Sequence, residues 1–303
     1  MIKHTDLVHT YSIIAIDREA GLMGGAVQSH YFSVGGTVIW AEAGTGVIAT
    51  QAMINMDYGP QGLELLRGDL SAGDVLSQLT AADKAADIRQ AAVLDCEGRT
   101  ETHTGAKTIA EAGHITGRGY SVQANMMLKD TVPAAMAEAF ETAAGRLQDR
   151  LMAALKAAEA EGGDIRGMQS AAMLIVSIED KGSVRDNRIL DLRVEDNPAP
   201  LDELERLLRV NDAYYYADQG DLAVEKGDAD AAMEAYRRAE ELQPDNIELL
   251  FWKAVSLLNS GQIDTARVIF AEVFKADENW RELLKRLPSA GVVTVEEDIL
   301  QFI

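Results

Sequence analysis

Four short runs of β-branched or small apolar residues near the start of the chain constrain its fold more than any other feature. They are Thr10–Asp17, Met23–His30, Thr37–Ala41 and Gly46–Gln51. Runs of this length, separated by glycine-containing turns, are typical of adjacent strands in one buried sheet. Hydroxyls, amides and an imidazole lie at the ends of these runs. A core needs no such groups, so we expect a functional site there.

The chain up to residue 208 continues in blocks: two helices, further strands, a pair of longer helices, and two last strands. Ser71 is placed as an N-cap, and Pro133 stands in the first turn of a helix, a position that proline favours. A doubly wound fold would alternate strands with helices, and no such alternation is present. The blocks therefore predict an α+β fold, a four-layer αββα sandwich of two facing sheets with helices outside.

From Ala213 onward the pattern is purely helical and repeats after 34 residues. The recurring pairs are Gly227 with Gly261, Ala232 with Ala266, Tyr236 with Phe270, and Ala239 with Val273. This spacing of small and aromatic residues is typical of tetratricopeptide repeats, although generic helical hairpins are an alternative. We predict an N-terminal extension over residues 1–9, a sandwich domain over 10–208 and a repeat domain over 209–303. The repeats would bind a peptide or protein partner, or complete a dimer interface.

Charge and composition exclude several classes of partner. The formal net charge is −21, spread over both parts of the chain, so we expect neither nucleic acid nor an anionic membrane surface as a partner. One cysteine, Cys96, allows no intrachain disulfide, and His30, His103 and His114 show no metal-ligand spacing. We expect no metal and no cofactor. No signal peptide and no apolar run of about 18 residues is present, so a cytoplasmic location is expected.

Thr10 is the candidate nucleophile. An N-terminal threonine uses its own α-amine as the base, so it needs no histidine beside it. Nine residues precede Thr10, and attack of its hydroxyl on the His9 carbonyl would remove them. The alternative is that Thr10 merely opens a strand, as threonines often do.

The other candidate residues are polar groups at the ends of strands. Asn125 would donate to a developing oxyanion. Arg166 would clamp a substrate carboxylate, or simply pair with Asp164. The remaining candidates would bind substrate, or only cap strand ends: Gln28, Ser29, His30, Gln51 and Asn55.

Residues 10–208 resemble a known family, the domain of unknown function 1028. The matching segments are Thr10–Ile13, Gly25–Gly35, Trp40–Gly44, Ala49–Gln51, Arg166–Ala171 and Asp191–Val194. That family is grouped with the N-terminal-nucleophile hydrolases, and some members carry a helical tail. The resemblance implies the αββα sandwich and hydrolysis of amide bonds by a threonine, serine or cysteine at a mature N-terminus. In many similar chains the matching threonine directly follows the initiator methionine, whereas here nine residues precede it.

Together these features predict a hydrolase of a small amide substrate, with Thr10 as nucleophile and Asn125 or a backbone amide as oxyanion donor. The rival hypothesis is a non-catalytic ligand-binding or scaffold protein that keeps its N-terminus and uses the repeats to hold a partner or to dimerise. A hydrolase using Ser12 or Ser29 internally lacks an adjacent base. We also expect a homo-oligomer.

Overall fold

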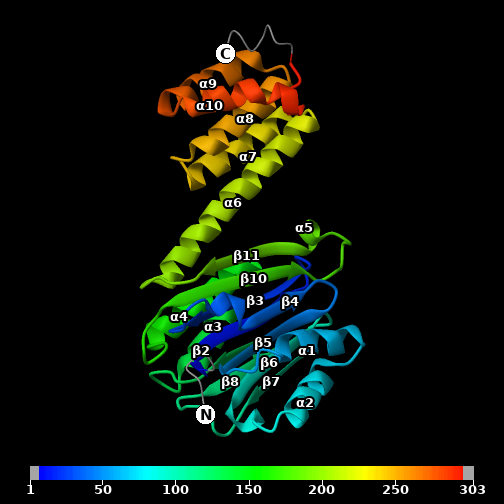
Figure 1. Ribbon diagram of the computed structural model, residues 1–303, viewed down its shortest axis with the longest axis vertical. Coiled ribbons are helices and arrows are strands. Elements are labelled where there is room, and N and C mark those ends of the chain that lie inside the picture. The colour runs from blue at the N-terminus through cyan, green and yellow to red at the C-terminus, as the bar shows by residue number, and fades with distance from the viewer. Residues whose placement is uncertain (1–6, 296–303) are drawn as a thin grey trace. The chain divides into compact units, whose positions relative to one another are not determined.

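The computed structural model describes residues 7–295, and the chain divides into two compact units, one ending at Glu205 and one beginning at Arg206. The first unit is a mixed α+β domain with antiparallel sheets, and the second is all-helical (Figure 1). Of the expected N-terminal extension, residues 1–6 lie outside the described residues.

The strand that begins at Thr10 lies inside a six-stranded antiparallel sheet, here called sheet B. Its order is β11 (Arg188–Val194), β10 (Ser170–Ser177), β3 (Leu22–Ser29), β2 (Thr10–Asp17), β9 (Tyr120–Ala124) and β8 (Gly113–Gly117). Thr10 pairs with Ser29, and Tyr11 pairs with both Gln28 and Ala124. The predicted adjacency of the first two runs is therefore confirmed.

The other sheet, sheet A, is built around β5 (Gly46–Met53). Along one edge β5 pairs with β6 (Arg89–Asp95), which in turn pairs with β7 (Thr100–Thr104). Two short strands share its other edge: β4 (Ile39–Glu42) and β1 (Leu7–Val8). Leu7 and Val8, which precede Thr10 in the chain, are thus paired in sheet A.

Helices cover the outer faces of both sheets. On sheet A, α1 (Tyr58–Arg67) and α2 (Ala72–Ala82) bury Leu63, Leu66 and Val75 against Ile48 and Val93. On sheet B, α3 (Val132–Thr142) and α4 (Leu147–Glu161) contact β2, β3 and β9. Short elements complete the unit: α5 (Val184–Asn187) and 3-10 turns at Val34–Gly36 and Ala86–Ile88.

The layer between the two sheets changes character along β2. Side chains of a strand alternate between its faces, so Thr10, Ser12 and Ile14 point the same way, toward sheet A. Ile14 belongs to an apolar cluster with residues of both sheets, including Val27 and Val47. Toward Thr10 this layer consists instead of buried hydroxyls and amides. An interior with so many polar groups is stable only if they hydrogen-bond one another.

The second unit confirms the 34-residue repeat. Its helices are the C-terminal part of α6 (Pro200–Glu225), α7 (Ala229–Leu242), α8 (Ile247–Asn259), α9 (Ile263–Ala276) and α10 (Asn279–Arg286), with a 3-10 turn at Pro288–Ala290. The equivalent positions Ala232 and Ala266, like Tyr236 and Phe270, are buried. Gly227 and Gly261 have φ angles of 74° and 83°, a left-handed conformation that favours glycine and recurs at the same point of each repeat.

One helix differs from expectation. The sequence pattern predicts a helix over residues 201–210. In the structure this helix is α6, which continues through Gly220 to Glu225, because residues 201–219 contain no glycine or proline and are compatible with a helix.

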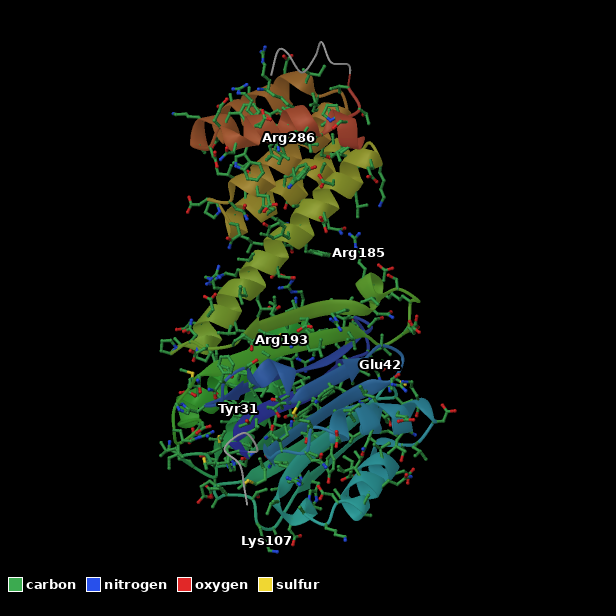
Figure 2. The ribbon with its side chains drawn as sticks, viewed as in Figure 1. Tyr31, Glu42, Lys107, Arg185, Arg193 and Arg286 are labelled. Atoms are coloured by element: carbon green, nitrogen blue, oxygen red, sulfur yellow. The ribbon has the colours of Figure 1, made fainter. Side chains whose placement is uncertain are left out.

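Charged side chains cover the outside of both units (Figure 2). Many are paired, as Glu42 is with Arg67 and Arg286 is with Glu282, but exposed pairs of this kind contribute little to stability. Among residues 7–295, no helix combines the length and apolarity needed to cross a bilayer.

Candidate functional site

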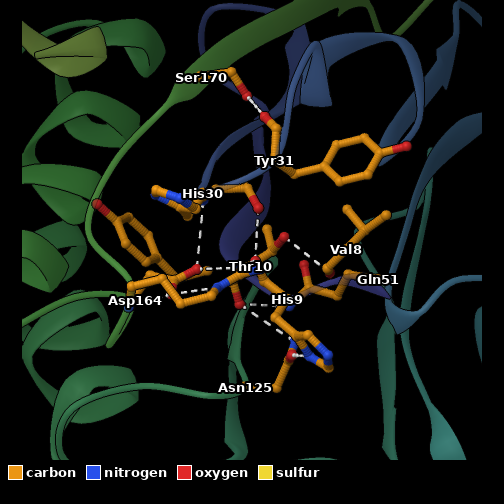
Figure 3. A network of polar contacts seen from close by, with 12 residues as sticks. Val8, His9, Thr10, His30, Tyr31, Gln51, Asn125, Asp164 and Ser170 are labelled. Atoms are coloured by element: carbon orange, nitrogen blue, oxygen red, sulfur yellow. Dashed lines mark hydrogen bonds and ion pairs between the residues drawn. The ribbon is translucent and has the colours of Figure 1, made fainter. Parts of the chain in front are cut away.

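Thr10 is the first residue of β2 and is fully buried. Its hydroxyl donates to the carbonyl oxygen of Val8 at 2.9 Å. Val8 and His9 are also buried, so the His9–Thr10 peptide bond lies inside the domain, at the polar end of the layer between the sheets (Figure 3). The Thr10 hydroxyl is therefore buried next to the carbonyl of the preceding residue, His9, and is not accessible to an external substrate.

The carbonyl oxygen of His9 receives two side-chain hydrogen bonds. The hydroxyl of Ser29, the strand partner of Thr10, donates to it at 2.6 Å. The Nη2 of Arg166 donates to it at 2.9 Å. Two donors on one carbonyl, one of them cationic, favour negative charge on that oxygen. Both donors therefore converge on the carbonyl of the peptide bond that precedes Thr10.

Asp164 holds Arg166 in place. Its two carboxylate oxygens accept from the guanidinium, Oδ2 from Nη2 at 2.7 Å and Oδ1 from Nε at 3.0 Å. The Asp164 side chain has no exposed surface, whereas that of Arg166 is 27% exposed. The two alternatives considered for Arg166 thus coexist: it pairs with Asp164 and also contacts a carbonyl at the site.

The carbonyl of Thr10 is held separately by Asn125 and Gln51. The Asn125 backbone N–H donates to it at 3.1 Å, and the side-chain amides of Gln51 and Asn125 donate at 3.2 Å and 3.3 Å. Asn125 Nδ2 also donates to Gln90. Asn125 thus donates to the carbonyl of Thr10 and to Gln90, and its expected role as an oxyanion donor toward a substrate stays a prediction.

A network of side-chain amides extends from these residues through the layer between the sheets. Gln51 Nε2 donates to Gln90 Oε1 at 2.7 Å, Ser12 Oγ donates to Gln51 Oε1 at 2.6 Å, and Gln123 Nε2 donates to Ser12 Oγ at 2.6 Å. The sequence pattern predicted neither Gln90 nor Gln123 as a site residue. Ser121 and Gln123 alternate onto one face of β9, and Asn125 follows directly after the strand in the same alternation, which was the signal available in the sequence.

Burial favours the neutral form of the His9 imidazole. Burial lowers its pKa most strongly; the hydrogen bond to Asn125 raises the pKa, and the positive charge of Arg166 lowers it. The Nδ1 of His9 lies 2.7 Å from Asn125 Oδ1, and since Asn125 Nδ2 is occupied as a donor, Nδ1 must carry the proton. Nε2 is then an unprotonated acceptor, and it is buried without a hydrogen-bond partner in the described part of the chain.

The structure brings some predicted site residues together and separates others. Ser29, Gln51, Asn125 and Arg166 surround the His9–Thr10 bond. Three other predicted residues lie away from this bond: Gln28, His30 and Asn55.

Gln28 follows the alternation of β3 onto the opposite face of sheet B, beside Tyr11, whose hydroxyl donates to Glu159 of α4. Burial, and then Glu159, raise the pKa of Tyr11 well above its ordinary value. Both polar atoms of the Gln28 amide are buried without a hydrogen-bond partner among residues 7–295.

His30 has an exposed side chain, and only its backbone N–H reaches Asp164, at 3.4 Å. The side chain of Asn55 donates to Asp83, which also binds Arg89, in a separate cluster. Within the described residues, no group of three or more histidine, cysteine, aspartate or glutamate side chains is arranged to hold a metal ion.

Comparisons with known proteins agree with the two-part organisation. Residues 10–204 match the model described as "Family of unknown function (DUF1028)". Two tetratricopeptide repeat models match residues 223–287 and 192–247. The crystal structure of protein SPO2555 from Silicibacter pomeroyi, whose title names the same family, is 32% identical, with a TM-score of 0.61; the match covers 66% of this chain and 85% of that one. No curated protein matches. The repeats suggest protein–protein interaction.

Proposed function

The chain belongs to the DUF1028 family, a family of unknown function, and we propose that it is the precursor of an amide hydrolase of the N-terminal-nucleophile type. The observation that carries the proposal is the pair of donors, Ser29 and Arg166, on the one carbonyl that precedes a buried threonine. The two facing sheets with helices outside also agree with the four-layer αββα sandwich of that superfamily.

The first reaction is cleavage of the chain by itself. The Thr10 hydroxyl gives up its bond to the Val8 carbonyl, and its oxygen attacks the carbonyl carbon of His9. The negative charge that develops on the His9 oxygen is stabilised by Ser29 and Arg166. The C–N bond then breaks, the hydroxyl proton passes to the Thr10 nitrogen, and an ester joins His9 to the Thr10 oxygen. Water hydrolyses this ester, which releases residues 1–9.

Cleavage creates the catalyst for external amides. The α-amine of Thr10, with an ordinary pKa of about 7.7–8.0, accepts the proton of the Thr10 hydroxyl as that oxygen attacks the substrate carbonyl. Ser29 and Arg166 again face the oxyanion, while Gln51 and Asn125 hold the Thr10 carbonyl and so fix the direction of its side chain. Nothing in this chemistry calls for a metal or an organic cofactor.

The test is the intact mass and N-terminal sequence of the protein purified without an N-terminal tag. A chain that begins at Thr10 is the expected result. Thr10→Ala should remain whole, and Thr10→Ser, which keeps a hydroxyl, should still be cleaved. A native chain that stays uncleaved through prolonged incubation would refute the proposal and leave the binding or scaffold hypothesis ahead.

A second candidate function, which is independent of the first, rests on a groove in the repeat unit. The groove has a volume of about 480 Å³ and is bordered by α6 and α8. Its lining includes four carboxylates and two aromatic rings: Asp218, Asp221, Glu225, Glu248, Tyr214 and Trp252. This lining favours a basic peptide with an apolar residue. Titration of Trp252 fluorescence with lysine-rich and glutamate-rich peptides, at low and high salt, tests it; equal binding of both would contradict it.

A further inference from the structure

The residues before Thr10 occupy the space that a substrate would need. Leu7 and Val8 form β1 and pair with Met53 and Ala52 on the edge of β5 that β4 leaves open. Val8 is fully buried and belongs to the apolar cluster between the sheets. His9 follows, with its ring on Asn125 and its carbonyl on Ser29 and Arg166. Departure of this segment would expose three adjacent features: the edge of β5, the apolar site now filled by Val8, and the hydrogen-bonding groups that now contact His9.

The chemistry of the proposed function links this segment to the substrate. The ester formed during self-cleavage joins the acyl group of His9 to the Thr10 oxygen. An external amide also forms an ester between its acyl group and the Thr10 oxygen. The two species differ only in the acyl group. A site that holds the first ester in a reactive geometry is therefore already shaped for substrates whose acyl part resembles Leu7–Val8–His9.

We propose, on the premise of the function above, that the substrate is a peptide whose acyl half binds as an added strand on β5 in place of Leu7–His9. Backbone pairing with Ala52 and Met53 supplies affinity, as in other recognition by strand addition. The residue before the cleaved bond carries a side chain that donates one hydrogen bond to Asn125 Oδ1. The residue preceding it is small and apolar and fills the site of Val8.

The orphaned nitrogen of His9 fits this role. Its Nε2 is buried without a partner, and such an atom weakens the binding of the side chain that carries it. The released segment is therefore held less tightly than its burial alone implies. Asparagine and glutamine side chains also carry an N–H group that can donate to Asn125 Oδ1, and they belong to the same substrate class as histidine.

The experiment uses the protein after its terminus has been shown to be Thr10, and it compares fluorogenic peptide amides that differ at one position. Acetyl-Leu-Val-His-amide is the reference. Replacing histidine with leucine removes the donor and should lower kcat/KM about tenfold, whereas glutamine should preserve it. Replacing valine with aspartate puts a charge into an apolar site and should lower kcat/KM about a hundredfold or more. An Asn125→Leu variant should lose the preference for histidine over leucine.

The outcomes separate this inference from its premise. Hydrolysis that depends on Thr10 but shows no preference among these peptides would overturn the substrate class and leave the hydrolase standing. Preference for histidine that persists in Asn125→Leu would overturn the role given to Asn125. A chain that never begins at Thr10 would overturn both proposals together.

Discussion

Ser29→Ala is the most direct test of the site, because it removes one of the two donors on the His9 carbonyl and little else. The Ser29 hydroxyl donates to that carbonyl at 2.6 Å, and the methyl group of alanine occupies the same buried position without a donor. Loss of one donor to a developing oxyanion raises a barrier by about 2.7–4 kcal/mol, which is about a hundred- to thousand-fold in rate. The fold itself should lose only about 1 kcal/mol, since Arg166 still donates to the carbonyl.

Ser170→Ala is the matched control. Ser170 pairs with Ser29 across β10 and β3, is equally buried, and donates its hydroxyl to the Tyr31 carbonyl instead of the His9 carbonyl. A time course of intact mass on freshly produced protein measures the cleavage rate of each variant. We expect Ser29→Ala to be slowed at least a hundredfold and Ser170→Ala to stay within a few-fold of the native rate. Equal rates for both variants, close to the native rate, would refute the oxyanion role of Ser29.

Three further predictions concern stability. Arg166→Met leaves the fully buried carboxylate of Asp164 without its cation and should lower the free energy of unfolding in urea by about 3–5 kcal/mol, part of which Asp164→Asn in the same chain should restore. Phe270→Ala opens a cavity in the repeat unit and should lower its free energy of unfolding by about 3–5 kcal/mol while leaving self-cleavage unchanged. Slower self-cleavage would contradict the expectation that the site does not depend on the repeat unit. Burial raises the pKa of Asp221, so the folded state binds this proton more tightly than the unfolded state and loses stability as the pH rises above about 3.9. Asp221→Asn should flatten that part of the stability–pH curve, and an unchanged slope would show that another group causes it.

The sequence predicted the arrangement of elements well because local patterns determine them. Periodicity alone predicted the 34-residue repeat and the strands at Thr10–Asp17 and Gly46–Gln51. The prediction that this helix ends at Val210 was wrong, because no glycine or proline follows there to end it, and α6 continues to Glu225.

The site was only partly predictable, because contacts between distant strands decide it. Thr10, Ser29 and Arg166 were recognised as polar groups at strand ends, yet their meeting point, the His9 carbonyl, depends on how β2, β3 and the loop before β10 come together. Gln28 shows that neighbours in the sequence can also be separated in space. It stands next to Ser29 in sequence, but strand alternation sends it to the opposite face of the sheet.

The amide network between the sheets limits how this end of the domain can evolve. Gln51 Nε2 and Asn125 Nδ2 both donate to the same oxygen of Gln90, so replacing Gln90 alone would take one acceptor from each of two buried amides, which would keep only their bonds to backbone carbonyls. At the apolar end of the same layer, single substitutions such as valine to isoleucine, which add one methylene group, need no change elsewhere. The polar end can change only by paired substitutions, and across related chains the residues at positions 51, 90 and 125 should therefore vary together or not at all.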